Sequence, residues 1–129
     1  MLFRSDANPA TFGIVRGAVS ELHAIAERRD DSQMRDLVAT MRSKTIRLRR
    51  DVYAAVEADD ADQARLAWRA ESLDLATRAA TAVITAKAGA SMQRGCTAER
   101  RLREAMFLQV QAQTAATRHA SLALIEGQM

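Results

Sequence analysis

The sequence has few of the residues that interrupt helices or build strands. It holds one proline, near its start, and five glycines among 129 residues. Aromatic residues are equally scarce, with three phenylalanines, one tryptophan and one tyrosine. No stretch therefore shows the turn residues and the alternating β-branched or aromatic residues of an all-β protein. These absences exclude a β-rich fold and indicate a chain that is helical nearly throughout.

Cysteine and long apolar runs are also lacking. Cys96 is the single cysteine, so no intrachain disulfide can form. The apolar run at residues 1–3 ends at Arg4 and is too short for a secretory signal peptide. No run approaches the roughly 18 apolar residues that a membrane-spanning helix needs. We therefore expect a cytoplasmic protein without a membrane span.

Neither sign of charge is in large excess. Nineteen Lys and Arg residues face sixteen Asp and Glu residues, which gives a formal net charge of +3. Arginine supplies nearly all of the positive charge, because Lys44 and Lys87 are the only lysines. A surplus this small is weak evidence for a polyanionic partner, so the distribution of the charges matters more than their sum.

What the sequence does contain is helical periodicity. Apolar residues recur every three or four positions, which is typical of amphipathic helices. The pattern predicts four helices, at residues 9–29, 33–58, 61–88 and 91–127. Pro9 after Asn8 suits the start of the first helix, and Asp60 with Gln63 resembles a capping box at the start of the third. Gly89 is the residue type expected just past a helix end.

Two places interrupt the helical pattern. Residues 28–32 read Arg-Arg-Asp-Asp-Ser, which places cations at one helix end and an acidic or hydroxyl residue at the next helix start. We expect a short turn there and not one continuous helix. Gly95 predicts a kink or break in the last helix, which would form again at Thr97.

The predicted fold is all-α, an antiparallel up-down-up-down four-helix bundle with a long C-terminal helix. Short connections between amphipathic helices make successive helices alternate in direction. The chain fits a single domain, residues 1–129. The last helix is much longer than the first, so one of its ends should project or pack against a second subunit. We therefore expect a homodimer.

The densest charge lies on the second predicted helix, whose cations are Arg35, Arg42, Lys44, Arg47, Arg49 and Arg50. Arg35, Arg42 and Arg49 are spaced by seven residues and share one helix face. The simpler interpretation is a solvated face whose cations pair with Asp and Glu of neighbouring helices. It is favoured because no aromatic residue or phosphate loop accompanies the charges. The alternative is a surface that binds an acidic partner or an anion, with nucleic acid less favoured.

No motif for enzymatic chemistry occurs, so we predict a protein that is not an enzyme and has no cofactor. A metal site in a helical bundle would need a carboxylate three residues before each histidine. Ser20 and Ala116 hold those positions before His23 and His119, so both histidines are expected at the edge of the core. Cys96 is expected to be an ordinary free thiol, and the single tryptophan is also expected at the core edge.

Several stretches resemble PhoU-type phosphate-regulatory proteins. They are residues 52–56, 59–65 and 71–74, which are similar to the family's helical hairpin, and residues 115–120, similar to its final helix. The resemblance covers residues 33–127 as a single repeat and implies a helical scaffold that binds partner proteins. Thr114 and Arg118 stand at the positions of the family's acidic metal ligands, so its metal cluster is not implied. The hairpin is also similar to part of the effector domain of GntR-type repressors, whose metal ligands are likewise unmatched.

These observations lead to two functional hypotheses. The first is a non-enzymatic regulatory or adaptor bundle that acts through protein–protein contacts, with the cations of the second helix meeting an acidic surface. The alternative is a helical domain that senses a small anion or a cofactor held between its helices. An internal cavity lined by polar residues would favour the sensor. A flat apolar face that continues across a symmetry axis would favour the interaction module.

Overall fold

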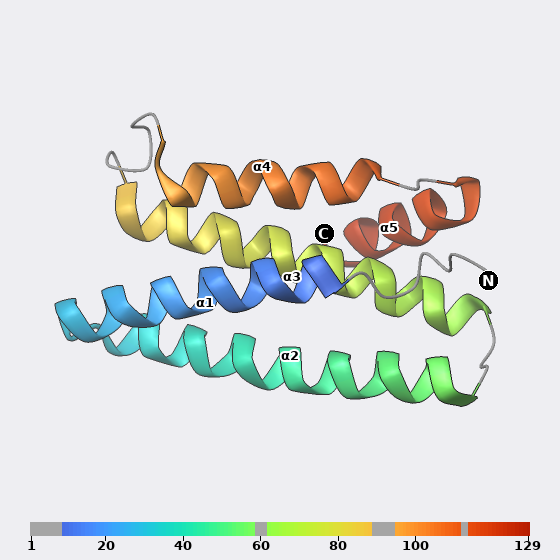
Figure 1. Cartoon of the computed structure of the whole chain (residues 1–129), viewed down its shortest axis with the longest axis horizontal. Helices are drawn as coiled ribbons and strands as arrows, with labels where there is room; N and C mark the ends of the chain where they lie inside the picture. The colour runs from blue at the N-terminus through green and yellow to red at the C-terminus, as the bar shows by residue number, and fades with distance from the viewer. Residues whose placement is uncertain (1–8, 59–61, 89–94, 112–113) are drawn as a thin grey trace.

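The computed structural model describes residues 9–58, 62–88, 95–111 and 114–129, and these residues are almost entirely helical (Figure 1). The helices are α1 (Pro9–Arg29), α2 (Ser32–Ala58), α3 (Asp62–Lys87), α4 (Thr97–Val110) and α5 (Ala115–Gly127). The described ranges contain no strand, so the predicted all-α class is confirmed. Within them, no helix combines the length and the apolar character needed to cross a membrane.

Helix α3 is the centre of the fold. It contacts each of the four other helices of the described chain, whereas α5 contacts α3 alone. Successive helices from α1 to α4 alternate in direction, and α5 folds back beside α3 (Figure 1). The sequence explains the position of α3, because its buried residues surround much of the helix and are often small, as at Ala70, Ala76, Ala79 and Ala80. A helix that is apolar on several sides is buried by its neighbours.

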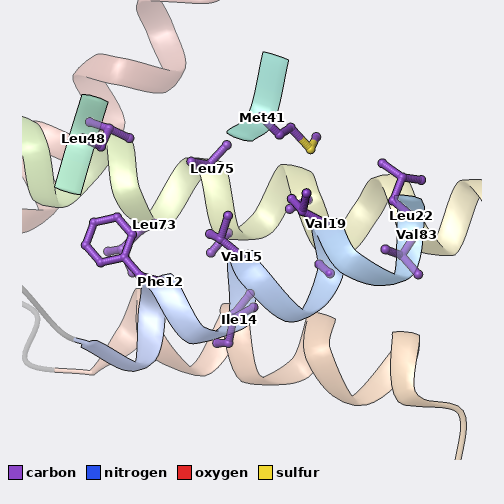
Figure 2. Packing of buried hydrophobic residues seen from close by; sticks show 14 of the residues in the cluster. Phe12, Ile14, Val15, Val19, Leu22, Met41, Leu48, Leu73, Leu75 and Val83 are labelled. Atoms are coloured by element: carbon purple, nitrogen blue, oxygen red, sulfur yellow. The ribbon is translucent and has the colours of Figure 1, made fainter. Parts of the chain in front are cut away.

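The core lies between α1, α2, α3 and α4. Val15, Val19 and Leu22 of α1 belong to one cluster with Leu75 and Val83 of α3 (Figure 2). Helix α2 contributes a stripe at helical spacing, namely Val38, Met41, Leu48 and Val52. Ile14 lies on another side of α1, toward α4 (Figure 2). Because α1 is buried on two sides, its remaining surface is the narrow strip between α2 and α4.

A tight turn joins α1 to α2, as the sequence predicts. Asp30 adopts a left-handed backbone conformation with φ 51°, and the Asp31 N–H donates to the Ala26 carbonyl at 3.0 Å. This pattern satisfies the carbonyls at the end of α1. The Asp31 Oδ1 then accepts from the Met34 N–H at 2.9 Å, which caps the start of α2. The turn sets α1 and α2 side by side and antiparallel.

The C-terminal region differs from the expected single helix over residues 91–127. The break at Gly95 is confirmed, since Gly95 has φ 78° and α4 begins at Thr97. A second break, which we did not predict, separates α4 from α5. Gln111 is extended, and the Thr114 hydroxyl and Thr117 exchange hydrogen bonds in a capping box that starts α5. The expected four-helix plan with one long last helix therefore gives way to two shorter helices.

Three predicted helix ends, at Asn8, Asp60 and Gly89, lie outside the described residues. The neighbouring positions agree with the predicted bounds, because α1 begins at Pro9 and α3 spans Asp62–Lys87.

Candidate binding groove between α1 and α2

The six cations of the second predicted helix do not act as one surface. Arg35 turns back to α1, where its guanidinium pairs with Glu27 at 2.8 Å and Asp30 at 2.7 Å. The hydrogen bonds from Arg35 hold the pKa of the exposed Glu27 carboxyl below its ordinary value, and the same contacts raise the pKa of Arg35. Arg35 therefore secures the α1–α2 turn and is not available to a partner.

Two further cations are paired along α2. Arg47 lies 3.4 Å from Glu71 of α3 and 3.9 Å from Asp51. Arg50 lies 3.5 Å from Asp51. Lys44 is half-buried and makes no ion pair with a described residue. Arg35, Arg47 and Arg50 thus match the solvated, paired face that the sequence favoured.

The remaining two, Arg42 and Arg49, border a groove between α1 and α2 with a volume of about 550 Å³. We call it the arginine groove. Its apolar surface consists of Phe12, Val15 and Val19 from α1 with Ile46 and Tyr53 from α2. Phe12, Val15 and Val19 are buried at its base, whereas Ile46 is 68% exposed and Tyr53 44% exposed.

A third arginine, Arg16 of α1, completes the groove. Arg16, Arg42 and Arg49 make no ion pair with any residue that the structure describes, and no Asp or Glu lines the groove. The Arg49 guanidinium lies 6.0 Å from the centre of the Phe12 ring and 5.8 Å from that of Tyr53. Both contacts are cation–π interactions, so aromatic rings position this charge without neutralising it.

The sequence did not predict Arg16 as a site residue. Arg42 and Arg49 were found because they stand seven residues apart in a dense run of cations, whereas Arg16 is an isolated charge in a helix of small and apolar residues. The antiparallel packing of α1 against α2 brings it to the groove. The only signal in the sequence is its place in α1, one turn from Phe12 and Ser20.

Other grooves of the described structure are different in charge. A groove of about 780 Å³ between α1 and α4 includes Arg100, Arg101 and Arg103. Each of those is paired with a carboxylate, at Glu104, Glu21 and Glu99 respectively. A groove of about 770 Å³, mainly between α2 and α3, is lined largely by threonine and apolar residues, with Asp31 and two arginines. Arg78 pairs with Asp74, and Arg29 donates a hydrogen bond to the Ala86 carbonyl. Of these three grooves, the arginine groove is the one bordered by three arginines that make no ion pair with a described residue.

The residues considered for metal binding lie apart. His23 is half-buried on α1, His119 is exposed on α5, and Cys96 is half-buried just before α4. Thr114 caps α5, and Arg118 is exposed. Among the described residues, no three His, Cys, Asp or Glu side chains are grouped to hold a metal ion. The single tryptophan, Trp68 of α3, packs against the core edge as predicted.

No family model, curated protein or solved structure matches this chain.

Proposed function

We propose that this protein is a non-enzymatic regulatory or adaptor bundle that binds a partner protein through the arginine groove. The observation that supports the proposal is the combination of three arginines that make no ion pair with a described residue and an exposed apolar surface between them. Exposed apolar surface beside unneutralised charge is typical of a binding site, because a partner gains both apolar burial and charge pairing there. The groove is open to solvent along exposed residues of both helices.

The alternative, a sensor of a small anion or cofactor, has less support. A small anion is held by cations that converge on one point. Arg42 and Arg49 leave the same helix seven residues apart, which is about 10.5 Å along its axis. Such spacing fits a row of negative charges better than a single ion.

Four further expectations stay as proposals. We propose a cytoplasmic protein with a PhoU-like scaffold but without that family's metal cluster, and an antiparallel four-helix core of α1–α4 to which α5 is added. We also propose a homodimer, since Met106, Phe107 and Val110 of α4 are each at least 58% exposed. Light scattering after size-exclusion chromatography tests the dimer, and the proposal is wrong if the mass is that of one chain at all concentrations.

The test of the adaptor proposal is site-specific photo-crosslinking in a lysate of the source cells. A photoreactive phenylalanine analogue placed at Ile46 reports on the arginine groove, and the same analogue at Arg118 on α5 serves as the control. We expect a discrete protein adduct from position 46 that disappears when Arg42→Glu and Arg49→Glu are added, with none from position 118. If no adduct depends on the arginines, the proposed function is wrong.

A further inference from the structure

We infer that the occupant of the arginine groove is an acidic amphipathic helix supplied by a partner protein. This inference rests on the proposed function and specifies the chemistry of the partner. It depends on three features of the groove: its length, the positions of its charges and the apolar surface between them.

The groove has the dimensions of a site for one helix. It is formed by two packed antiparallel helices and extends from Arg42 to Tyr53 on α2. Eleven residue steps of α-helix correspond to about 16 Å, or three turns. A third helix lying along two others packs its side chains between theirs, which is how helical peptides dock in grooves of helical proteins.

The charges repeat with the period of a helix. Arg42 and Arg49 are seven residues apart on α2, and Arg16 borders the groove from α1. Carboxylates at positions i and i+7 of a docked helix would therefore face Arg42 and Arg49. A carboxylate at i+3 or i+4 would lie at the intermediate level, where it could reach Arg16. The partner's acidic residues thus need helical spacing and not merely negative charge.

Apolar surface alternates with this charge. Ile46 and Tyr53 each stand four residues after one of the α2 arginines, and α1 supplies Phe12, Val15 and Val19. Apolar side chains between the partner's carboxylates would bury Ile46, which is otherwise 68% exposed. On the α1 side, a Cβ added at Gly13 would meet no heavy atom within 4 Å. The partner helix therefore has space to approach α1 closely at this residue.

The same features disfavour other anionic partners. Non-specific binding of nucleic acid relies on several phosphate contacts and, for single strands, on free aromatic faces. Here three arginines border the groove, and the Phe12 and Tyr53 rings already lie against Arg49. The apolar base would also gain little from a sugar–phosphate backbone, whereas it matches leucine or isoleucine side chains of an amphipathic helix.

The inference is tested with the full-length chain and synthetic peptides in fluorescence anisotropy titrations. The probe is a peptide of about three heptads with leucine at the core positions and glutamate beside them. One comparison peptide has lysine in place of glutamate, and another has the same composition in scrambled order. We expect the glutamate peptide to bind and the two comparison peptides to bind at least about tenfold more weakly.

Matched variants locate the binding. Arg42→Glu with Arg49→Glu should weaken binding of the glutamate peptide at least about tenfold. Arg28→Glu with Arg118→Glu changes the net charge equally at exposed sites outside the groove and should leave binding unchanged. Ile46→Ala should weaken binding about threefold or more, because apolar contact is lost at an exposed position. Unfolding curves for all variants establish that each is folded.

Several outcomes would overturn the inference. These are no binding of the glutamate peptide to the wild type, equal binding of the scrambled peptide, or equal loss in the Arg28 and Arg118 control. A further one is arginine-dependent binding of duplex DNA, anionic vesicles or inorganic phosphate to the protein at concentrations where the glutamate peptide does not bind. An arginine-dependent crosslink in lysate without peptide binding would refute this inference alone. The absence of any arginine-dependent crosslink from position 46 would refute the proposed function itself.

Discussion

Arginine takes three distinct roles in this chain, and the surroundings of each side chain decide which. Arg35 is neutralised by carboxylates, and Arg49 is positioned by two aromatic rings. Arg69 of α3 is buried, with 7% of its surface exposed. Its Nη2 donates to the Gln111 carbonyl at 3.1 Å, whereas its Nη1 has no hydrogen-bond partner among the described residues, and burial lowers the pKa of its guanidinium. Burial of the Arg69 charge therefore lowers the stability of the folded state.

Replacement of Arg69 by methionine should not destabilise the protein. Arg69→Met keeps a long unbranched side chain in the same space and removes a buried charge with an unsatisfied nitrogen. We expect the free energy of unfolding to stay equal to that of the wild type or to rise by about 1–3 kcal/mol in urea titrations. Arg69→Ala is the matched control, because it leaves a void and should lower stability. A methionine variant less stable than the alanine variant would contradict this account.

At the scale of single elements, the sequence predicted most helices and missed what depends on packing between them. The predicted ranges 9–29, 33–58 and 61–88 agree with α1, α2 and α3 to within a residue. The break between α4 and α5 contains no proline or glycine that would have marked it. It depends on a Thr114–Thr117 cap without the usual Glu or Gln, and on Arg69 binding the Gln111 carbonyl from another helix.

The sequence likewise predicted one part of the candidate site and missed another. Periodicity identified Arg42 and Arg49, because residues seven apart on a helix share a face. It did not separate them from Arg47, whose partner Glu71 lies 24 residues further along the chain. Only the packing of the helices shows which cations are neutralised.

Helix α2 has a buried face and a groove face, and two of its residues make the contrast testable. Leu48 is fully buried, whereas Ile46, two residues earlier, is 68% exposed. Leu48→Ala should lower the free energy of unfolding by about 2–5 kcal/mol, since it removes core contacts and leaves a cavity. Ile46→Ala should change it by less than about 0.5 kcal/mol. Urea unfolding of both variants measures the difference, and similar losses would mean that α2 is rotated relative to this structure.

The α1–α2 turn should make stability depend on pH through Glu27. Its pKa is lower in the folded state because Arg35 donates to the carboxylate, so its stabilising contribution is present at neutral pH. That contribution is lost as the pH falls through the folded pKa. The melting temperature of Glu27→Gln should therefore lie below that of the wild type at pH 7, and the gap should close at about pH 3.

The matched control for this pH dependence is Glu126→Gln. Glu126 is exposed at the end of α5 and makes no ion pair with a described residue. Thermal unfolding followed by circular dichroism at both pH values should show no closing gap for this variant. A gap for Glu27→Gln that persists unchanged at acid pH would show that the carboxylate does not stabilise the turn.

For the molecule as a whole, the helices differ in how much of the core they hold. Helix α1 contacts α2, α3 and α4 and contributes Phe12, Val15 and Leu22 to the core. Among the described helices, α5 contacts α3 alone, and Thr117 is its one buried residue. Leu122 and Ile125 of α5 are more than half exposed. The cooperative unit of folding should therefore consist of α1–α4, with α5 added to it.

Truncations should separate these contributions. A chain that ends at Gln111 lacks α5 and should keep a cooperative thermal transition, at a lower temperature than the full chain. A chain that begins at Asp31 lacks α1 and should show no cooperative transition, because the buried faces of α2 and α3 lose their main cover. Circular dichroism and calorimetry measure both. If the chain that ends at Gln111 had no cooperative transition while the chain that begins at Asp31 kept one, this division of the fold would be contradicted.

The sole tryptophan and the sole tyrosine occupy different environments, since Trp68 packs at the core edge of α3 and Tyr53 lies 44% exposed at the arginine groove. An unlabelled sample thus carries two intrinsic optical reporters. Indole emission should follow unfolding, because Trp68 then moves into water. Phenol absorbance should follow occupancy of the groove, without a dye attached at Cys96.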